Sequence, residues 1–205
     1  MANANDFKRR FLESYNELHE RLSSAGRWEE IWKKQWNGFM LWQQTGEWTP
    51  PAGDSVLALT ARKMNLQYNN GEPLRLDAAF CALNNQHPWF PMEVAIEHEN
   101  EARGFETEIL KLLSIRCRLK VGITYTGYNY RTAKSGNERI REIIEDRFEI
   151  ARRQGEEHST EYLFLVGTDG WQDKDDIRPR LECKWYELEF SAGKGLEDKE
   201  FALFT

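Results

Sequence analysis

Three acidic residues, Asp77, Glu97 and Glu99, have side chains and a spacing that fit a metal-binding site. If residues 74–83 and 92–100 pair as an antiparallel hairpin, Asp77 lies opposite Glu97, with Cβ atoms about 5 Å apart. Glu99 then lies on the same face, about 7 Å further along its strand. Carboxylates so close repel one another unless they share a cation, so this geometry predicts a site for Mg²⁺ or Mn²⁺. The alternative is a different register, with the acids on a solvated sheet face.

Lys111 could complete such a site from the helix that follows Glu99. It lies off the apolar stripe of Ile109 and Leu112, so it can reach toward the carboxylates and a bound phosphate. The alternative is an ordinary helical ion pair with Glu108, three residues earlier.

A basic and aromatic region could contact nucleic acid. Residues 103–153 hold 12 Lys and Arg against 7 Asp and Glu, whereas the remainder holds 16 against 27. Basic groups interleaved with aromatic rings can bind phosphates and stack bases. The alternatives are a solvated helix face and tyrosines that pack locally. The candidate residues are Arg116, Arg118, Lys120, Tyr128, Tyr130, Arg131 and Lys134.

Hydrophobic periodicity predicts the elements that position these residues. Apolar residues repeat at helical spacing in some segments and alternate or form short apolar runs in others. The sequence predicts helices at about 6–24, 27–44, 55–66, 106–117 and 137–153, and strands at about 74–83, 92–100, 119–125, 162–167 and 184–190. Asp6 is the expected cap of the first helix. This order predicts an α/β protein with a mixed sheet flanked by helices.

The 205 residues fit one domain. Within it we expect an N-terminal helical hairpin extension (1–50), a core (54–170) and a C-terminal strand and tail (171–205). The second helix carries four tryptophans, which suit core packing or a surface for a partner or a second copy of the chain. These are Trp28, Trp32, Trp36 and Trp42.

Composition excludes several classes of protein. No stretch approaches the roughly 20 apolar residues of a membrane span, and the first residues lack the pattern of a secretory signal. Cys81, Cys117 and Cys183 stand far apart, which predicts a reducing compartment and no zinc site. We therefore expect a cytoplasmic protein. The net charge of −6 argues against a generic polyanion binder.

The run from Pro73 to Tyr125, which includes "LRLDAAF" and "MEVAIEHENEARGFETEILKLL", resembles the catalytic core of the PD-(D/E)XK nuclease superfamily, which includes type II restriction endonucleases. In that signature an Asp on one strand precedes an acid-x-Lys motif on the next, followed by a helix and another strand. Asp77 stands at the Asp and Glu97 at the acid. Two positions depart from the pattern, because Leu76 replaces the proline and Glu99 the lysine.

The resemblance implies a restriction-endonuclease-like fold and Mg²⁺-dependent (or Mn²⁺-dependent) hydrolysis of DNA, with RNA left open. Asp77 and Glu97 would hold the metal, Glu99 would be a ligand or orient water, and Lys111 would stabilise the phosphate. An upstream Glu often completes such sites; Glu29, Glu30 and Glu47 are available. Such enzymes are often dimers. The alternative is a catalytically inactive member of the fold that binds nucleic acid or protein.

Overall fold

The computed structural model of the protein describes most of the chain. The described residues are 2–28, 31, 36–41, 55–70, 75–83, 91–100, 104–126, 133–153, 160–167, 185–191 and 202–204. The chain divides into two compact units, Met1–Val94 and Ala95–Thr205. The boundary falls inside one strand, β3 (Met92–His98).

The strands form one mixed sheet in the order β1-β2-β3-β4-β5-β6-β7. β1 pairs antiparallel with β2, β4 pairs parallel with β5, and β5–β6 and β6–β7 are antiparallel. The bounds are Leu66–Asn70 for β1, Ala78–Ala82 for β2, Leu119–Tyr125 for β4, Glu161–Gly167 for β5, Trp185–Ser191 for β6 and Ala202–Phe204 for β7. The predicted α/β class is therefore confirmed.

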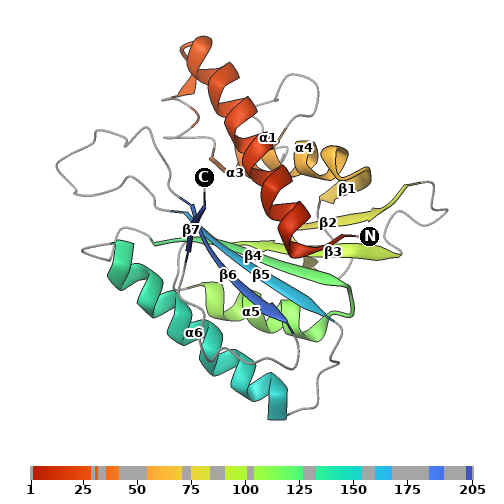
Figure 1. The fold of residues 1–205 in the computed structure, drawn as a ribbon, viewed down its shortest axis with the longest axis vertical. Helices are drawn as coiled ribbons and strands as arrows, with labels where there is room; N and C mark the ends of the chain where they lie inside the picture. The colour runs from red at the N-terminus through yellow and green to blue at the C-terminus, as the bar shows by residue number, and fades with distance from the viewer. Residues whose placement is uncertain are drawn as a thin grey trace. The chain divides into compact units, whose positions relative to one another are not determined.

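In the first unit, α1 (Ala4–Ser24) is the long helix drawn in red in Figure 1. Its sequence has an apolar stripe and a polar face. The five large apolar residues that make up this stripe are all buried: Phe7, Phe11, Tyr15, Leu18 and Leu22. The predicted cap is wrong by three residues, because the side chain of Asn3 caps the helix by accepting from the backbone N–H of Asp6 at 2.8 Å. Both residues carry a short polar side chain that suits a cap.

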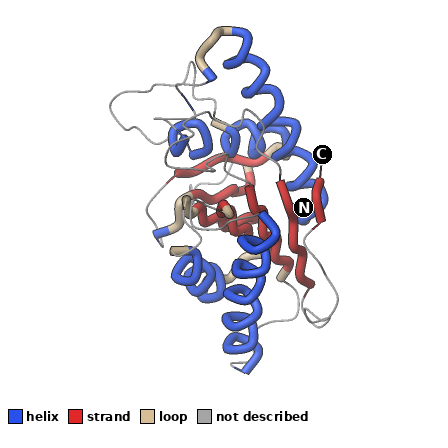
Figure 2. Tube along the Cα trace, turned by 90° about the vertical axis from the view of Figure 1, so that its left-hand side faces the viewer, coloured by secondary structure: helices blue, strands red, loops and turns tan. Residues whose placement is uncertain are grey.

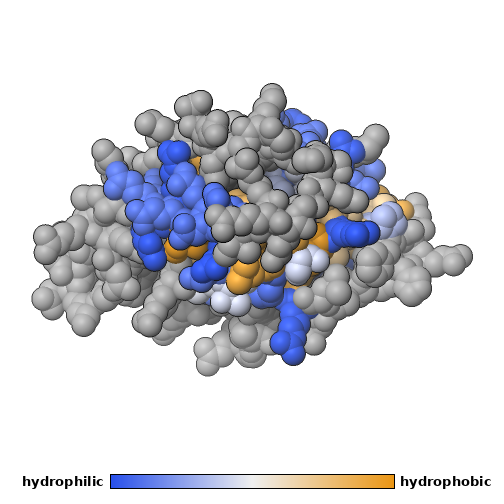
Figure 3. All heavy atoms as spheres, turned by 90° about the horizontal axis from the view of Figure 1, so that it is seen from below, coloured by the Kyte–Doolittle hydropathy of each residue, from blue (hydrophilic) through white to orange (hydrophobic). Residues whose placement is uncertain are grey.

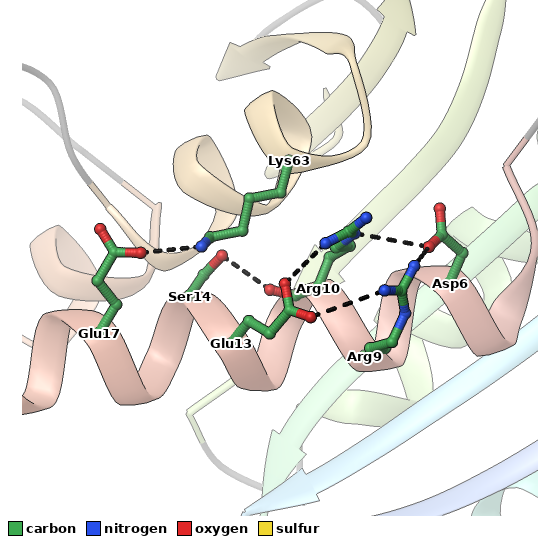
Figure 4. Close-up of polar contacts among 7 residues, drawn as sticks. All are labelled: Asp6, Arg9, Arg10, Glu13, Ser14, Glu17 and Lys63. Atoms are coloured by element: carbon green, nitrogen blue, oxygen red, sulfur yellow. Dashed lines mark hydrogen bonds and ion pairs between the residues drawn. The ribbon is translucent and has the colours of Figure 1, made fainter.

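The polar face of α1 carries a ladder of ion pairs (Figure 4). Arg10 reaches Glu13 at 2.9 Å, and Arg9 reaches Asp6 at 2.5 Å. Lys63, at the end of α4 (Val56–Lys63), contacts Glu17 of α1 at 2.9 Å and so joins α4 to α1. The side chain of Ser55 caps α4 by accepting from the backbone N–H of Ala58 at 3.1 Å.

The predicted second helix is described in part. α3 (Trp36–Leu41) lies within it, and Trp28 is buried in edge-to-face contact with Tyr15 and Phe39. This packing confirms a core role for Trp28. Trp32 and Trp42 lie outside the described residues, as does the side chain of Trp36.

In the second unit, the chain alternates helix and strand from β3 to β5. α5 (Phe105–Ser114) connects β3 to β4, and α6 (Ala133–Arg153) connects β4 to β5. The two helices pack together and lie against the same side of the strands (Figure 1). Figure 2 shows the helices in blue and the strands in red in a second view. Arg147 of α6 also forms an ion pair with Glu106 of α5.

Two strands were not expected from the sequence. β1 occupies residues for which the pattern predicts a helix end and a turn; its polar sequence, Leu-Gln-Tyr-Asn-Asn, lacks an alternating signal and depends on pairing with β2. β7 is only three residues long. Among the described residues no helix is apolar over the length that a membrane crossing needs. The described surface seen in Figure 3 is mainly hydrophilic, with small apolar areas.

Candidate metal centre

The centre of the candidate site is the carboxylate of Glu97, near the carboxyl end of β3. Glu97 is fully buried, with 0% of its side chain exposed. Two residues of α5 face it, Glu108 and Lys111, whose side chains are 14% and 30% exposed. They are three residues apart and so share one side of the helix. The strand and the helix that follows it therefore bring three charged groups together.

Lys111 contacts both carboxylates. Its Nζ lies 3.2 Å from each carboxylate oxygen of Glu97 and also forms an ion pair with Glu108. The sequence left open whether Lys111 reaches the sheet or pairs with Glu108, and the structure contains both contacts. A charged donor held between two carboxylates forms strong hydrogen bonds in a partly buried site.

The environment keeps Lys111 protonated. Burial lowers the pKa of its ammonium, but the hydrogen bonds and charges of Glu108 and Glu97 outweigh burial and raise the pKa above its usual value. Lys111 is therefore a cation throughout the neutral range. One positive charge stands against two acidic side chains.

A third acidic side chain belongs to this group. Asp77, Glu97 and Glu108 each offer a carboxylate oxygen, and these oxygens lie within 4.8 Å of one another, so the group could hold a metal ion. Asp77 is half-buried, in a bend directly before β2. Asp77 and Glu97 were predicted for the site, whereas Glu108 was not. Its spacing from Lys111 on the side of α5 that packs against the sheet is the signal that could have found it.

The chemistry of the group fits a hard cation. All three side chains offer carboxylate oxygen, which Mg²⁺ and Mn²⁺ prefer, and the group contains no Cys or His of the kind that softer metals prefer. Three carboxylates beside the ammonium of Lys111 have negative charge that a divalent cation would neutralise. The three acidic residues therefore fit the divalent metal ion that the sequence resemblance implies.

Glu99 lies elsewhere on the same side of the sheet. Its backbone N–H donates to the carbonyl of Ile123 at 2.8 Å, just past the end of β3. Its carboxylate packs over Gly104, where any Cβ would come within 2.5 Å of Oε2. Gly104 directly precedes α5, so the carboxylate lies at the positive end of that helix. The metal group described above contains Glu108, and Glu99 stands beside it rather than in it.

His98 faces the opposite side of the sheet, as the alternation along β3 predicts. Its Nε2 lies 2.9 Å from the hydroxyl of Tyr125, whose ring packs against Trp185. Burial lowers the pKa of His98 to about 3, so the imidazole is neutral. His98 is a core residue and not a candidate ligand.

The candidate nucleic-acid residues fall into three groups. Arg116 and Arg118 are exposed between α5 and β4. Lys120 is buried, and its ammonium contacts the carbonyl of Leu113 at 3.3 Å and the hydroxyl of Tyr162 at 2.9 Å, which is a structural role and does not suit a phosphate contact. The rest lie outside the described residues or have side chains that are not described: Tyr128, Tyr130, Arg131 and Lys134, and likewise the upstream acids Glu29, Glu30 and Glu47.

The fold and the acidic group define an α/β protein that could bind a divalent metal. Comparisons with protein-family models, curated proteins and solved structures found no match.

Proposed function

We propose that this protein is a divalent-metal-dependent nuclease that hydrolyses phosphodiester bonds of DNA, with a core like that of restriction endonucleases. The observation that carries the proposal is the buried carboxylate of Glu97, grouped with Asp77 and Glu108 and contacted by Lys111. The strand–strand–helix–strand order around these residues supports it, because β2, β3, α5 and β4 follow one another as in the PD-(D/E)XK pattern.

Each residue has a role in this proposal. Asp77, Glu97 and Glu108 would hold Mg²⁺ or Mn²⁺. The bound cation would lower the pKa of a water molecule and neutralise charge on the scissile phosphate. Glu99 would accept a hydrogen bond from the attacking water. Lys111, already protonated, would place its positive charge beside the phosphate as negative charge develops there.

A second candidate function also has an observation in its favour. Lys111 already provides a counter-charge for Glu97 and Glu108, as in a structural ion-pair cluster. In that case the protein is an inactive member of the fold that binds nucleic acid or a protein partner. The tryptophan-rich N-terminal segment would then be the partner or dimer surface.

Cleavage assays distinguish the two functions. Supercoiled plasmid, linear duplex and single-stranded DNA, and single-stranded RNA, would be incubated with wild type or Glu97→Gln in Mg²⁺ or Mn²⁺. Glu97→Gln keeps the shape of the side chain and removes its charge. A matched control is Glu142→Gln on α6, since Glu142 is 62% exposed and forms its ion pair with the exposed residue Arg139.

The nuclease proposal predicts metal-dependent nicking by wild type and Glu142→Gln, and a loss of at least about 100-fold in Glu97→Gln, as for removal of a charge-stabilising group in a site. Cleavage retained by Glu97→Gln would contradict the proposed centre. Failure of wild type to cleave any substrate with either metal would favour the inactive binding module.

A further inference from the structure

Thr124, in β4, has a buried hydroxyl that nothing in the site described above uses. The residue is fully buried, at 0% exposure. Its Oγ1 has no hydrogen-bond partner among the described residues. A buried hydroxyl without a partner costs free energy, and such a group commonly marks a bound water or ion.

The face of the sheet on which Thr124 lies follows from two contacts. The hydrogen bond between His98 and Tyr125 places these two side chains on one face. Side chains alternate along a strand, so Glu97, Glu99 and Thr124 lie on the other face, the one covered by α5. Gly122 confirms the assignment, because a Cβ there would approach the ring of Phe105 of α5 to 2.7 Å.

The pairing of β3 with β4 brings Thr124 level with Glu99. The backbone N–H of Glu99 donates to the carbonyl of Ile123, the residue directly before Thr124. Neighbouring strands lie about 4.8 Å apart, so Thr124 is the neighbour of Glu99 across the sheet. Thr124 therefore lies beside Glu99 on the face covered by α5.

A second buried polar group lies close to this end of β4. Asn137, in α6, is 8% exposed, and its Oδ1 also lacks a partner within the described ranges. The residue before it, Gly136, packs so tightly on Thr126 that a Cβ would come within 2.7 Å of the threonine Cβ. Two buried oxygens without partners thus occur around the carboxyl end of one strand, where open α/β sheets bind ligands.

We propose that Thr124 is a positioning residue of the metal centre, where its hydroxyl holds a water molecule of the hydrated cation beside Glu99. This inference rests on the proposed function. Mg²⁺ loses its waters reluctantly and binds proteins through one or two carboxylates with several waters retained. Those waters need hydrogen-bond partners beyond the direct ligands, and partners of this kind strongly affect metal affinity. Glu99 supplies an acceptor, and Thr124 supplies a group that both donates and accepts.

The test is the metal-induced rise in melting temperature of wild type, Thr124→Val and Thr124→Ser. Valine keeps the shape and strand preference of threonine without the hydroxyl, and serine keeps the hydroxyl. A matched control is Thr60→Val in α4, because Thr60 is equally buried but donates to the carbonyl of Val56 at 2.7 Å. Each protein is melted in a chelator and then with increasing Mg²⁺ or Mn²⁺.

We expect Thr124→Val to melt no lower than wild type in the chelator, because the lost hydroxyl had no partner. Its metal-induced rise should fall to less than half that of wild type, and Thr124→Ser and Thr60→Val should retain the full rise. An equal rise in Thr124→Val and wild type would overturn the inference while leaving the metal centre intact. No rise in wild type would contradict the proposed function itself.

Discussion

Lys111 contacts two acids of the second unit, Glu97 and Glu108. Its contribution to the stability of the folded protein depends on how deeply those acids are buried. An ammonium beside a fully buried carboxylate is screened far less than one at the surface. Without a bound cation, Lys111 is the group that neutralises Glu97. When a cation binds the same oxygens, the ammonium must share them or move away.

Replacing Lys111 with methionine tests this competition. Removing one partner of a fully buried pair costs about 3–5 kcal/mol; because Lys111 is partly exposed, we expect a loss of about 1–3 kcal/mol in the free energy of unfolding in a chelator. The metal-induced gain in stability should be larger than in wild type, because no ammonium competes for Glu97. Urea unfolding with and without Mn²⁺ measures both quantities.

Lys63→Met is the matched control. Lys63 is 28% exposed, close to the 30% of Lys111, but its partner Glu17 is 50% exposed whereas Glu97 is buried. A surface pair of this kind contributes about 0–1 kcal/mol. Equal losses in the two variants would show that the burial of Glu97 does not strengthen its ion pair.

His98 gives a pH-dependent prediction. Burial lowers its pKa from 6.5 to about 3, so between these values the unfolded chain takes up a proton that the folded protein does not. The stability from neutral His98 is therefore full above pH 6.5 and is lost as the pH falls toward 3. Between pH 7 and pH 5 wild type should lose about 2 kcal/mol more than His98→Gln. Parallel stability curves for the two proteins would contradict a buried, neutral imidazole.

The sequence predicted part of the candidate site. The alternation of side chains along the two strands was sufficient to predict that Asp77 and Glu97 share one face of the sheet. It also predicted that His98 lies on the other face. Glu108 was missed because, in one dimension, an acid three residues before a lysine looks like a surface helix pair. Only the packing of α5 on the sheet turns that pair toward Glu97.

The helix α5 packs closely on the sheet because β4 has no side chain at Gly122. A Cβ there would lie 2.7 Å from the rings of both Phe105 and Phe164. This close approach of helix and strand is what lets Glu108 and Lys111 reach the carboxylate of Glu97.

Gly122→Ala should therefore be destabilising. Inserting a methyl group into a filled interior costs about 1–3 kcal/mol, because the rings must leave their positions. Leu110→Ala on α5 is the control; Leu110 is 42% exposed, and its loss should change stability by less than about 0.5 kcal/mol. Chemical denaturation measures both. Full stability of Gly122→Ala would show that α5 does not pack closely over β4.

Segments with a strong apolar pattern were predicted with nearly the observed bounds, and strands without such a pattern were missed. The apolar run predicts the observed bounds of β4, Leu119–Tyr125, because most residues of that strand are apolar and all of them are buried. β1 and β7 were missed because one is polar and the other is three residues long, so neighbouring strands determine them rather than their own sequences. α6 begins four residues before the predicted start at Asn137.

At the scale of the whole molecule, the charge distribution agrees with a carboxylate centre next to a basic region. The protein has a net charge of −6, yet residues 103–153, which include α5, β4 and α6, carry an excess of Lys and Arg. Arg116 and Arg118 are exposed within that region, although Lys120 is not. If the protein acts on DNA as proposed, this excess of positive charge would attract the polyanion toward acids that would otherwise repel it.

Equilibrium binding of Mn²⁺ to the purified protein, measured by titration calorimetry, tests whether the acidic group is a metal centre. Wild type should bind saturably, and Asp77→Asn and Glu97→Gln should each bind at least about 10-fold more weakly, as expected when one charged ligand of a small set becomes neutral. Glu142→Gln should bind as wild type does. No saturable binding by wild type, or equal binding by all four proteins, would contradict a metal centre at Asp77, Glu97 and Glu108.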